Sequence, residues 1–233
     1  MRISFLFALS LFISFSALCQ QKKLVATYHS VKDPNSTAFA EALKDSGLPI
    51  DKIQRATNVS KATITIGKLW IESNTSSFKY VDRFVEGEYK KYYIAPDPSE
   101  WEQLSFYIKD LSAKKLYVVG NKLGKDQAVV DNLSTYNSWK LVAKDSTVNG
   151  LPCRLAVNQK YGYRAWYTPK IPLAHGPEIF GGLPGLIVVL ELPDQERSLV
   201  LQNIKEEYFD SKVLAVGEVK KKLTYEEYKK LGY

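Results

Sequence analysis

The stretch RAWYTPKIPLAHGPEIFGGLPGLIVVLEL, residues 164–192, joins a loop rich in proline and glycine to a continuously apolar run. Pro184 opposes a helix at this junction, and Gly185 permits a sharply bent entry into the run. Leu186 to Leu190 is apolar on both faces, which is typical of a central strand that is covered on each side. We therefore predict a buried corner that fastens the long loop to a β-sheet.

Local patterns around this stretch predict antiparallel pairing. Asn149 and Gly150 separate two alternating runs, and this pair favours a two-residue hairpin because both positions accept positive φ. We expect a hairpin over residues 139–158. Two further pairings are expected, of residues 105–109 with 116–121, and of residues 186–192 with 197–208 through Pro193, Asp194 and Gln195.

The beginning of the chain after residue 23 predicts one strand and one helix. Residues 24–31 read as an opening strand, and residues 36–46 read as a short helix that ends before Gly47 and Pro49. From there the alternation of apolar residues, beginning around Ala62, favours strands along most of the chain.

Two places have the residue spacing of a helix capping box. Thr224 and Glu227 predict a terminal helix that ends near Gly232, and Ser99 and Glu102 predict a single helical turn. With few helices and many local pairings, the expected fold is mainly β (α+β). We predict a single domain over residues 20–233, built as a curved antiparallel meander sheet or an open half-barrel with a few short helices.

The corner stretch resembles the GLPGLI family of secreted Bacteroidetes-type proteins. The six family residues are present as Gly182, Leu183, Pro184, Gly185, Leu186 and Ile187. They follow further residues of the family type, namely Ala165, Trp166, Tyr167, Thr168, Pro169, Gly176, Pro177 and Phe180. The resemblance implies secretion but no settled activity.

The first residues predict export. Arg2 and the short apolar run that follows are typical of a signal peptide over residues 1–19, too short to span a membrane comfortably. Ala17 and Cys19 are the small residues expected before cleavage, which leaves Gln20 first and no transmembrane segment. A lipid anchor at Cys19 is disfavoured by Leu18, so we expect a soluble periplasmic protein.

Composition narrows the classes of partner. The formal charge of +7 falls by one to +6 when Arg2 is removed with the signal peptide. The lysines are scattered in pairs without the pattern of an RNA-binding sheet, so no nucleic-acid partner is expected. Cleavage leaves Cys153 as a single thiol, and therefore the stability of about 210 residues must come from a hydrophobic core.

No pattern of catalytic or metal-binding residues emerges. Cys153 is in phase with apolar Leu155 and Val157, so we expect an inert buried thiol, with a reactive thiol as the lesser alternative. His29 and His175 lack the close spacing of zinc ligands. We predict no catalytic residue, no metal and no cofactor, although a pair of carboxylates would leave no signature.

The leading hypothesis is a non-enzymatic envelope accessory protein that binds an envelope protein through residues 168–182. The alternative is a carrier that encloses a small apolar or lipid-like ligand in its half-barrel, and an unrecognised hydrolase is the third choice. Aromatic clusters fit a groove or ordinary packing of a sheet. The candidate residues for ligand or partner binding are Trp166, Tyr167, Pro169, His175, Glu178 and Phe180.

Overall fold

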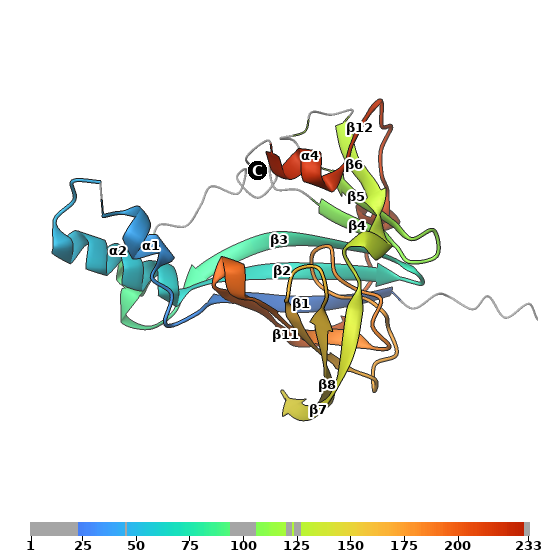
Figure 1. Ribbon diagram of the computed structural model, residues 1–233, viewed down its shortest axis with the longest axis horizontal. Helices are drawn as coiled ribbons and strands as arrows, with labels where there is room; N and C mark the ends of the chain where they lie inside the picture. Colours follow the sequence, from blue (N-terminus) through green and yellow to red (C-terminus); the bar gives the residue numbers. More distant parts are fainter. Residues whose placement is uncertain (1–22, 45, 94–105, 120–122, 124–126, 231–233) are drawn as a thin grey trace, which may run out of the picture.

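The computed structural model describes residues 23–44, 46–93, 106–119, 123 and 127–230 (Figure 1). The expected signal peptide, the capping pair Ser99 and Glu102, and Gly232 lie outside these residues. Twelve strands form one open sheet in the order β12-β6-β5-β4-β3-β2-β1-β11-β10-β9-β8-β7. All of its pairings are antiparallel except that of β12 with β6. The predicted mainly β, curved antiparallel sheet is confirmed.

The strands of the sheet are, in chain order, β1 (Lys23–Lys32), β2 (Thr63–Glu72), β3 (Thr75–Val85), β4 (Phe106–Asp110), β5 (Lys115–Val119), β6 (Gln127–Asn132), β7 (Trp139–Val148), β8 (Leu151–Asn158), β9 (Arg164–Thr168), β10 (Leu186–Leu192), β11 (Arg197–Glu206) and β12 (Lys221–Leu223). The α-helices are α1 (Ala38–Ala42), α2 (Ile50–Ala62) and α4 (Tyr225–Lys230). Short 3₁₀ turns are η1 (Gly87–Tyr92), η3 (Leu133–Thr135), η4 (Pro193–Gln195) and η5 (Ser211–Leu214).

The local hairpins form where turn residues predict them. Asn149 and Gly150 have φ of 48° and 76° between β7 and β8, as a two-residue hairpin with both positions left-handed requires. The β10–β11 hairpin turns through η4 and Glu196, whose φ is 47°. Strands β4 and β5 pair with Phe106 opposite Val119. All three predicted pairings are therefore confirmed.

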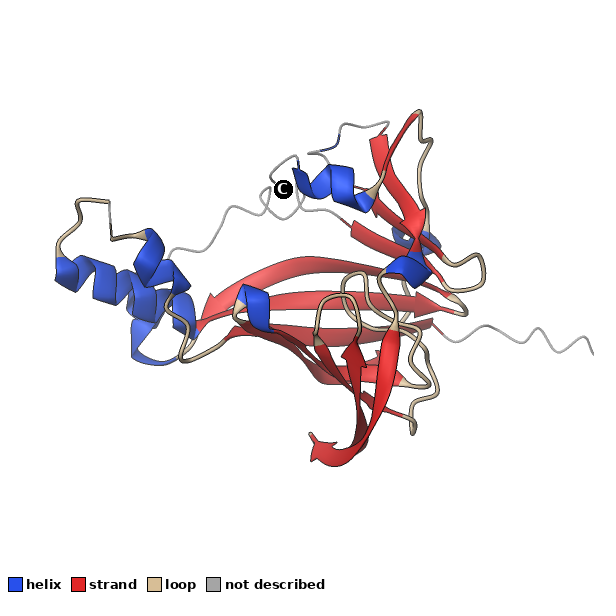
Figure 2. Ribbon diagram, viewed as in Figure 1, coloured by secondary structure: helices blue, strands red, loops and turns tan. Residues whose placement is uncertain are grey.

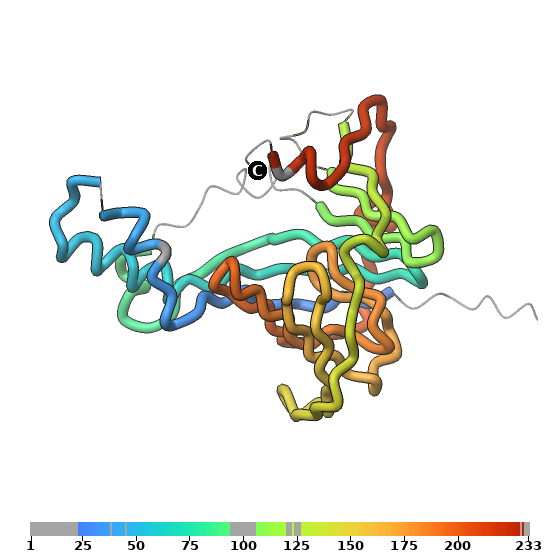
Figure 3. The backbone as a smooth tube through the Cα atoms, viewed as in Figure 1, coloured from blue at the N-terminus to red at the C-terminus, as the bar shows by residue number. Residues whose placement is uncertain are grey.

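One short connection shows why the sheet must curl. The chain leaves β6 near one edge and, after residues 133–138, enters β7 at the opposite edge (Figure 3). The two strands are ten positions apart in the sheet order, which would be about 48 Å in a flat sheet. The connection can span only about 25 Å. The edges must therefore approach each other across the concave face.

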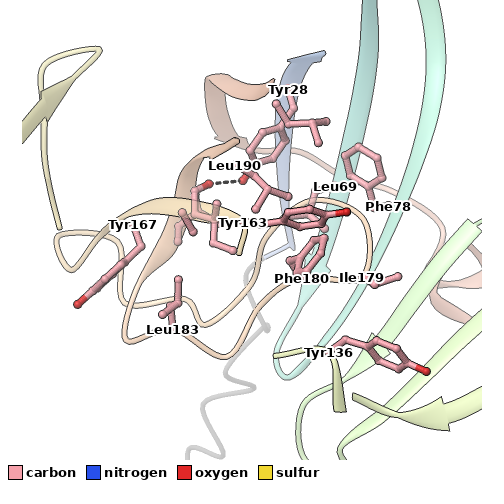
Figure 4. Packing of buried hydrophobic residues seen from close by; sticks show 14 of the residues in the cluster. Tyr28, Leu69, Phe78, Tyr136, Tyr163, Tyr167, Ile179, Phe180, Leu183 and Leu190 are labelled. Carbon is pink, nitrogen blue, oxygen red and sulfur yellow. Dashed lines mark hydrogen bonds between the residues drawn. The ribbon is translucent and has the colours of Figure 1, made fainter. Parts of the chain in front are cut away.

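Aromatic and branched side chains fill this concave face (Figure 4). Tyr28 is fully buried, makes an edge contact with Phe78, and donates a 2.7 Å hydrogen bond to the carbonyl of Ile187. A Cβ on Gly67 would lie 2.3 Å from the Phe78 ring, so a glycine is needed there for the ring to lie across β2. The core is thus built against the long loop that precedes β10.

Helices α1 and α2 lie at one end of the long strands, and α4 lies beside strands β6 and β12 at one edge of the sheet (Figure 2). The predicted helix over residues 36–46 is shorter, because α1 covers only Ala38–Ala42. Helix α2 was not predicted, because Pro49 in the sequence favours the end of a helix. Pro49 is also the N-cap of α2, a place where its missing amide hydrogen costs nothing. The terminal helix is confirmed, with Thr224 and Glu227 bonded reciprocally as a capping box.

Candidate functional site

The corner loop, residues 169–185, lies on the concave face and is bonded to itself and to β10. The amide of Gly182 donates to the carbonyl of Ala174 at 2.7 Å, and the amide of Ile187 donates to that of His175 at 3.1 Å. A Cβ on Gly185, whose φ is 155°, would lie 2.2 Å from the carbonyl oxygen of Thr168. Residues 182–187 therefore form a tight structural corner, as predicted.

Lys109 of β4 holds the corner loop to the sheet through hydrogen bonds. Its side chain is fully buried, and its Nζ donates to the carbonyls of Gly176, Glu178 at 2.6 Å and Phe180 at 3.0 Å. Burial lowers the pKa of Lys109 to about 7, against the opposing charge of Glu178. Three loop carbonyls thus depend on one amine for their partner.

A cluster of three polar side chains, Glu178, Tyr80 and Arg197, also holds the corner loop to the sheet. Glu178, with a φ of 50°, accepts hydrogen bonds from Tyr80 of β3 and, at 2.7 Å, from Arg197 of β11. Arg197 also donates to the hydroxyl of Tyr80 at 2.7 Å. Burial acts to lower the pKa of Arg197, but the charges and hydrogen bonds of Glu178 and Tyr80 together outweigh it and the pKa is raised. These charges satisfy one another within the fold.

His175 is used for structure as well. Its Nδ1 lies 3.0 Å from the hydroxyl of Ser76, and its Nε2 lies 3.1 Å from the carbonyl oxygen of Ser73. Burial lowers the pKa of His175 to about 4, so the imidazole is neutral at pH 7. Both ring nitrogens are occupied by the β2–β3 region rather than turned to solvent.

The predicted binding residues therefore divide into two sets. Tyr167, His175 and Phe180 are buried, and Glu178 is only 8% exposed, so these side chains lie in the interior and not on a recognition surface. This corrects the expectation that they face a partner. Hydrogen bonds of His175 and Glu178 and ring contacts of Phe180 attach the loop to the sheet, while Tyr167 belongs to the core cluster from β9. Trp166 is partly exposed and Pro169 is exposed, and their contact with a partner stays a prediction.

The opposite face of the sheet carries a row of four apolar side chains and one imidazole, which we call the outer strip. Its members lie in register across five neighbouring strands: Trp166, Val189, Val200, His29 and Ile66. All of them are partly exposed, whereas their chain neighbours Ala165, Leu190, Leu199 and Tyr28 are buried in the core. Because side chains alternate along strands, the strip lies on the other side of the sheet from these neighbours, although Trp166 and Val189 also pack against residues of the core cluster.

The borders of the outer strip are polar and partly basic. The indole of Trp166 donates to Glu191 at 3.1 Å, and Glu191 also pairs with Arg164. The amine of Lys144 lies 5.8 Å from the centroid of the Trp166 ring, and Lys68 of β2 is a further basic side chain two residues beyond Ile66. Burial lowers the pKa of His29, against the charge of Glu86, so the strip itself is uncharged at pH 7.

A different kind of surface lies at the tip, which we define as α1, α2 and η1 at one end of the long strands (Figure 1). A groove of about 430 Å³ there, the tip groove, is lined by Phe39, Lys52, Arg55, Ala56, Val59, Ser60 and Tyr92. Within α2 only Thr57 is buried. The tip therefore has little core of its own.

The described residues show no metal-binding group of three His, Cys, Asp or Glu side chains. Cys153 is 2% exposed, and burial raises the pKa of its thiol, as expected of a packed thiol. None of the described helices is long and apolar enough to cross a membrane.

The architecture is an open, curled antiparallel sheet whose concave face is filled by its own loop. A model of a family described as a protein of unknown function, Porph_ging, matches residues 124–189, which include the GLPGLI residues. No curated protein matches the sequence.

Two structures of PNGF-II, in the C2 and P21 space groups, are similar in fold. Each is 15% identical and covers 90% of this chain, with TM-scores of 0.49 and 0.50. This chain spans 32% and 33% of the two PNGF-II chains, about a third of their length. At this identity the likeness extends to the fold alone.

Sequence reasoning missed the side chains that hold the loop, namely Lys109, Tyr80 and Arg197. Lys109 ends a predicted strand, and nothing in its neighbourhood marks it as buried. Its partners are 67, 69 and 71 residues away along the chain. The only available signal was the length of the loop, since a long anchored loop must have its carbonyls satisfied from elsewhere.

Proposed function

We propose that this chain is an exported, non-enzymatic protein of the periplasm that binds an envelope protein through its outer strip. The observation that carries this proposal is the register of Trp166, Val189, Val200, His29 and Ile66 on the face opposite the core. An antiparallel sheet with one solvated face ordinarily alternates apolar and polar residues. A partly exposed apolar row across five strands is typical of a contact surface.

The partner surface is defined by complementarity to this strip. Its centre would be apolar to cover Val189 and Val200, and its margin would be acidic to face Lys68 and Lys144. Trp166 is the best candidate for an anchor, because tryptophan combines a large apolar area with a polar tip and is enriched among binding hot spots. This replaces the corner loop as the expected contact surface while keeping Trp166.

The non-enzymatic part of the proposal is supported by how the titratable groups are used. His175, Lys109 and Glu178 are the buried polar groups of the interior that catalysis most often recruits, and each is bonded to the loop or the sheet. Removing any of them for chemistry would release the corner loop. Binding needs none of these groups.

The carrier alternative is less well supported by the interior. Phe180, Leu183 and Ile187 of the corner region are each no more than 2% exposed and occupy the concave face where a ligand would lie. The described cavities lie at the tip and around η4 instead. A ligand inside the curled sheet would have to displace its core.

The test is site-specific photo-crosslinking in the native cell, with the photoreactive residue at Val200 and a control at Ser112, which is exposed away from the strip. We expect one envelope protein to be crosslinked from Val200 but not from Ser112. The same adduct should be lost when Val189→Lys is added. Equal crosslinking from both positions, or none from Val200, would rule out the strip as the contact surface.

Export is tested separately by fractionation and the intact mass of the periplasmic protein. A chain that begins at Gln20 and carries no lipid is expected. Retention in the cytoplasm, or a diacylglyceryl group on Cys19, would overturn the proposed localisation.

A further inference from the structure

Large apolar side chains are exposed at the tip. Among the described residues, three of the six exposed large hydrophobic side chains are found there: Phe39 at 43%, Ile50 at 85% and Tyr92 at 43%. A fourth, Leu48 at 44%, lies in the connection between α1 and α2. Helix α2 buries only Thr57. An amphipathic helix normally covers its apolar face with a core. Here Ala56 and Val59 of α2 line the tip groove instead.

The walls of the tip groove are apolar and its charges have one sign. Phe39, Ala56, Val59 and Tyr92 supply its apolar walls, and α1, α2 and η1 each contribute at least one of its residues. Its volume of about 430 Å³ lies within the range of small-molecule sites. The shape and lining suit a single narrow apolar chain.

Both charged residues of the lining are basic. Lys52 and Arg55 line the groove, and no carboxylate does. The guanidinium carbon of Arg55 lies 5.1 Å from the centroid of the Tyr92 ring, so this cation is held beside the apolar wall. A ligand with an anionic head beside its apolar chain would meet complementary charge here.

A neighbouring cavity is lined by charges of both signs. A cavity of about 480 Å³ beside η4 shares Phe39 and Ser60 with the groove, but it combines Lys32 and Lys61 with Asp194 and Glu196. Its mixed charges give no preference for an anion. A third cavity, of about 300 Å³, shares Arg55 and Tyr92 with the groove but adds Asp51 and Glu88. Of these three cavities, only the tip groove has basic residues and no carboxylate in its lining.

We propose that the tip groove binds a free single-chain anionic amphiphile, an acyl chain that ends in a carboxylate. The acyl chain lies along Ala56 and Val59 between Phe39 and Tyr92, and the carboxylate pairs with Lys52 and Arg55. This site is distinct from the outer strip on β9, β10, β11, β1 and β2. Its occupancy therefore does not depend on the proposed protein partner.

The experiment is calorimetric titration of the full mature chain with decanoate, with decanol as the neutral comparison. We expect saturable binding of decanoate and at least about fivefold weaker binding of decanol, the factor that about 1 kcal/mol of ion pairing represents. No saturable binding of decanoate, or equal affinity for both compounds, would overturn the proposal.

Matched variants locate the site. Ala56→Trp fills the groove and is expected to abolish decanoate binding, whereas Gln54→Trp, outside the groove lining on the same helix, should leave it unchanged. Arg55→Glu should weaken binding about fivefold or more, and Lys90→Glu on η1, outside the lining, should not. Equal effects of a variant and its control would overturn the assignment to this groove.

A second experiment, with lipid vesicles, distinguishes binding of a free amphiphile from docking on a membrane surface. The mature chain is sedimented with vesicles of phosphatidylglycerol, with and without decanoate. We expect no stable vesicle binding. Strong vesicle binding through Ile50 and Leu48 without saturable decanoate binding would overturn the proposal in favour of docking on a bilayer. The folding of every variant is checked by circular dichroism, so that loss of binding is not loss of structure.

Discussion

The corner loop and the tip use apolar side chains in opposite ways. The loop has no regular structure, yet Phe180 and Leu183 are buried and Lys109 bonds three of its carbonyls. The tip is helical, yet Ile50 is 85% exposed. Regular secondary structure is therefore a poor guide to where this fold is rigid. Satisfied hydrogen bonds and buried area decide that instead.

The largest effect is expected when the support of the loop is removed. Lys109→Met would leave the carbonyls of Gly176, Glu178 and Phe180 without their buried donor, at about 1 to 3 kcal/mol for each unsatisfied group. We expect a loss of at least about 3 kcal/mol in the free energy of unfolding, measured by urea denaturation. The control is exposed Lys115→Met on β5. Equal stability of the two variants would show that the lysine does not hold the loop.

A smaller loss is expected from the corner itself. Gly185→Ala would place a Cβ 2.2 Å from the carbonyl oxygen of Thr168 at a φ of 155°, so the backbone must shift. We expect about 2 to 3 kcal/mol of destabilisation in thermal or urea unfolding. Gly217→Ala, which meets nothing within 4 Å, is the matched control. A stable Gly185→Ala protein would mean that the corner is loosely packed.

Acid is expected to lower the free energy of unfolding through protonation of His175. Its folded pKa of about 4 is below the ordinary value of 6.5, so between these pH values the unfolded chain binds more protons. Stability is therefore lost as the pH falls from 6.5 to 4, by at most about 1.4 kcal/mol per pH unit.

Urea unfolding at several pH values measures this loss, and His175→Gln should reduce its slope. Asp131, whose pKa is lowered by hydrogen bonds from Tyr136 and backbone amides that outweigh its burial, contributes in the same direction in both proteins. An unchanged slope in His175→Gln would assign the acid sensitivity to other groups.

The smallest effect is expected at the tip. Ile50→Gln replaces a side chain that is 85% exposed, so stability should change by no more than about 0.5 kcal/mol. Leu183→Ala in the corner, where the side chain is 1% exposed, should cost about 2 to 5 kcal/mol in the same urea assay. A comparable loss in both variants would contradict the contrast between the two regions.

Much of the fold could be predicted from local sequence, and the exceptions have identifiable causes. Asn149 with Gly150 and the turn after Leu192 specify hairpins because turn conformation is local. Helix α2 was missed because Pro49, which favours the end of a helix, here directly precedes the first residue of one. The β12–β6 pairing left no signal, since two parallel strands need a distant crossover.

The candidate surfaces were harder to predict than the fold. Trp166 was selected, but the strip to which it belongs combines five strands whose order in the sheet no local pattern reveals. The tip groove was not predicted, because its lining combines α1, α2 and η1, and α2 itself was unexpected. Surfaces made by several distant segments require the tertiary arrangement.

The sequence by itself determined the mainly β class, the three hairpins, the capped terminal helix and the buried corner at Gly185. These depend on turn chemistry, alternation and backbone freedom, which act over a few residues. Only the tertiary structure decided that Lys109 supports the loop, that His175 and Phe180 are interior, and that apolar surface remains at the strip and tip. Those properties depend on which strands, distant in sequence, lie close together in the curled sheet. The burial of a side chain is set by these neighbours.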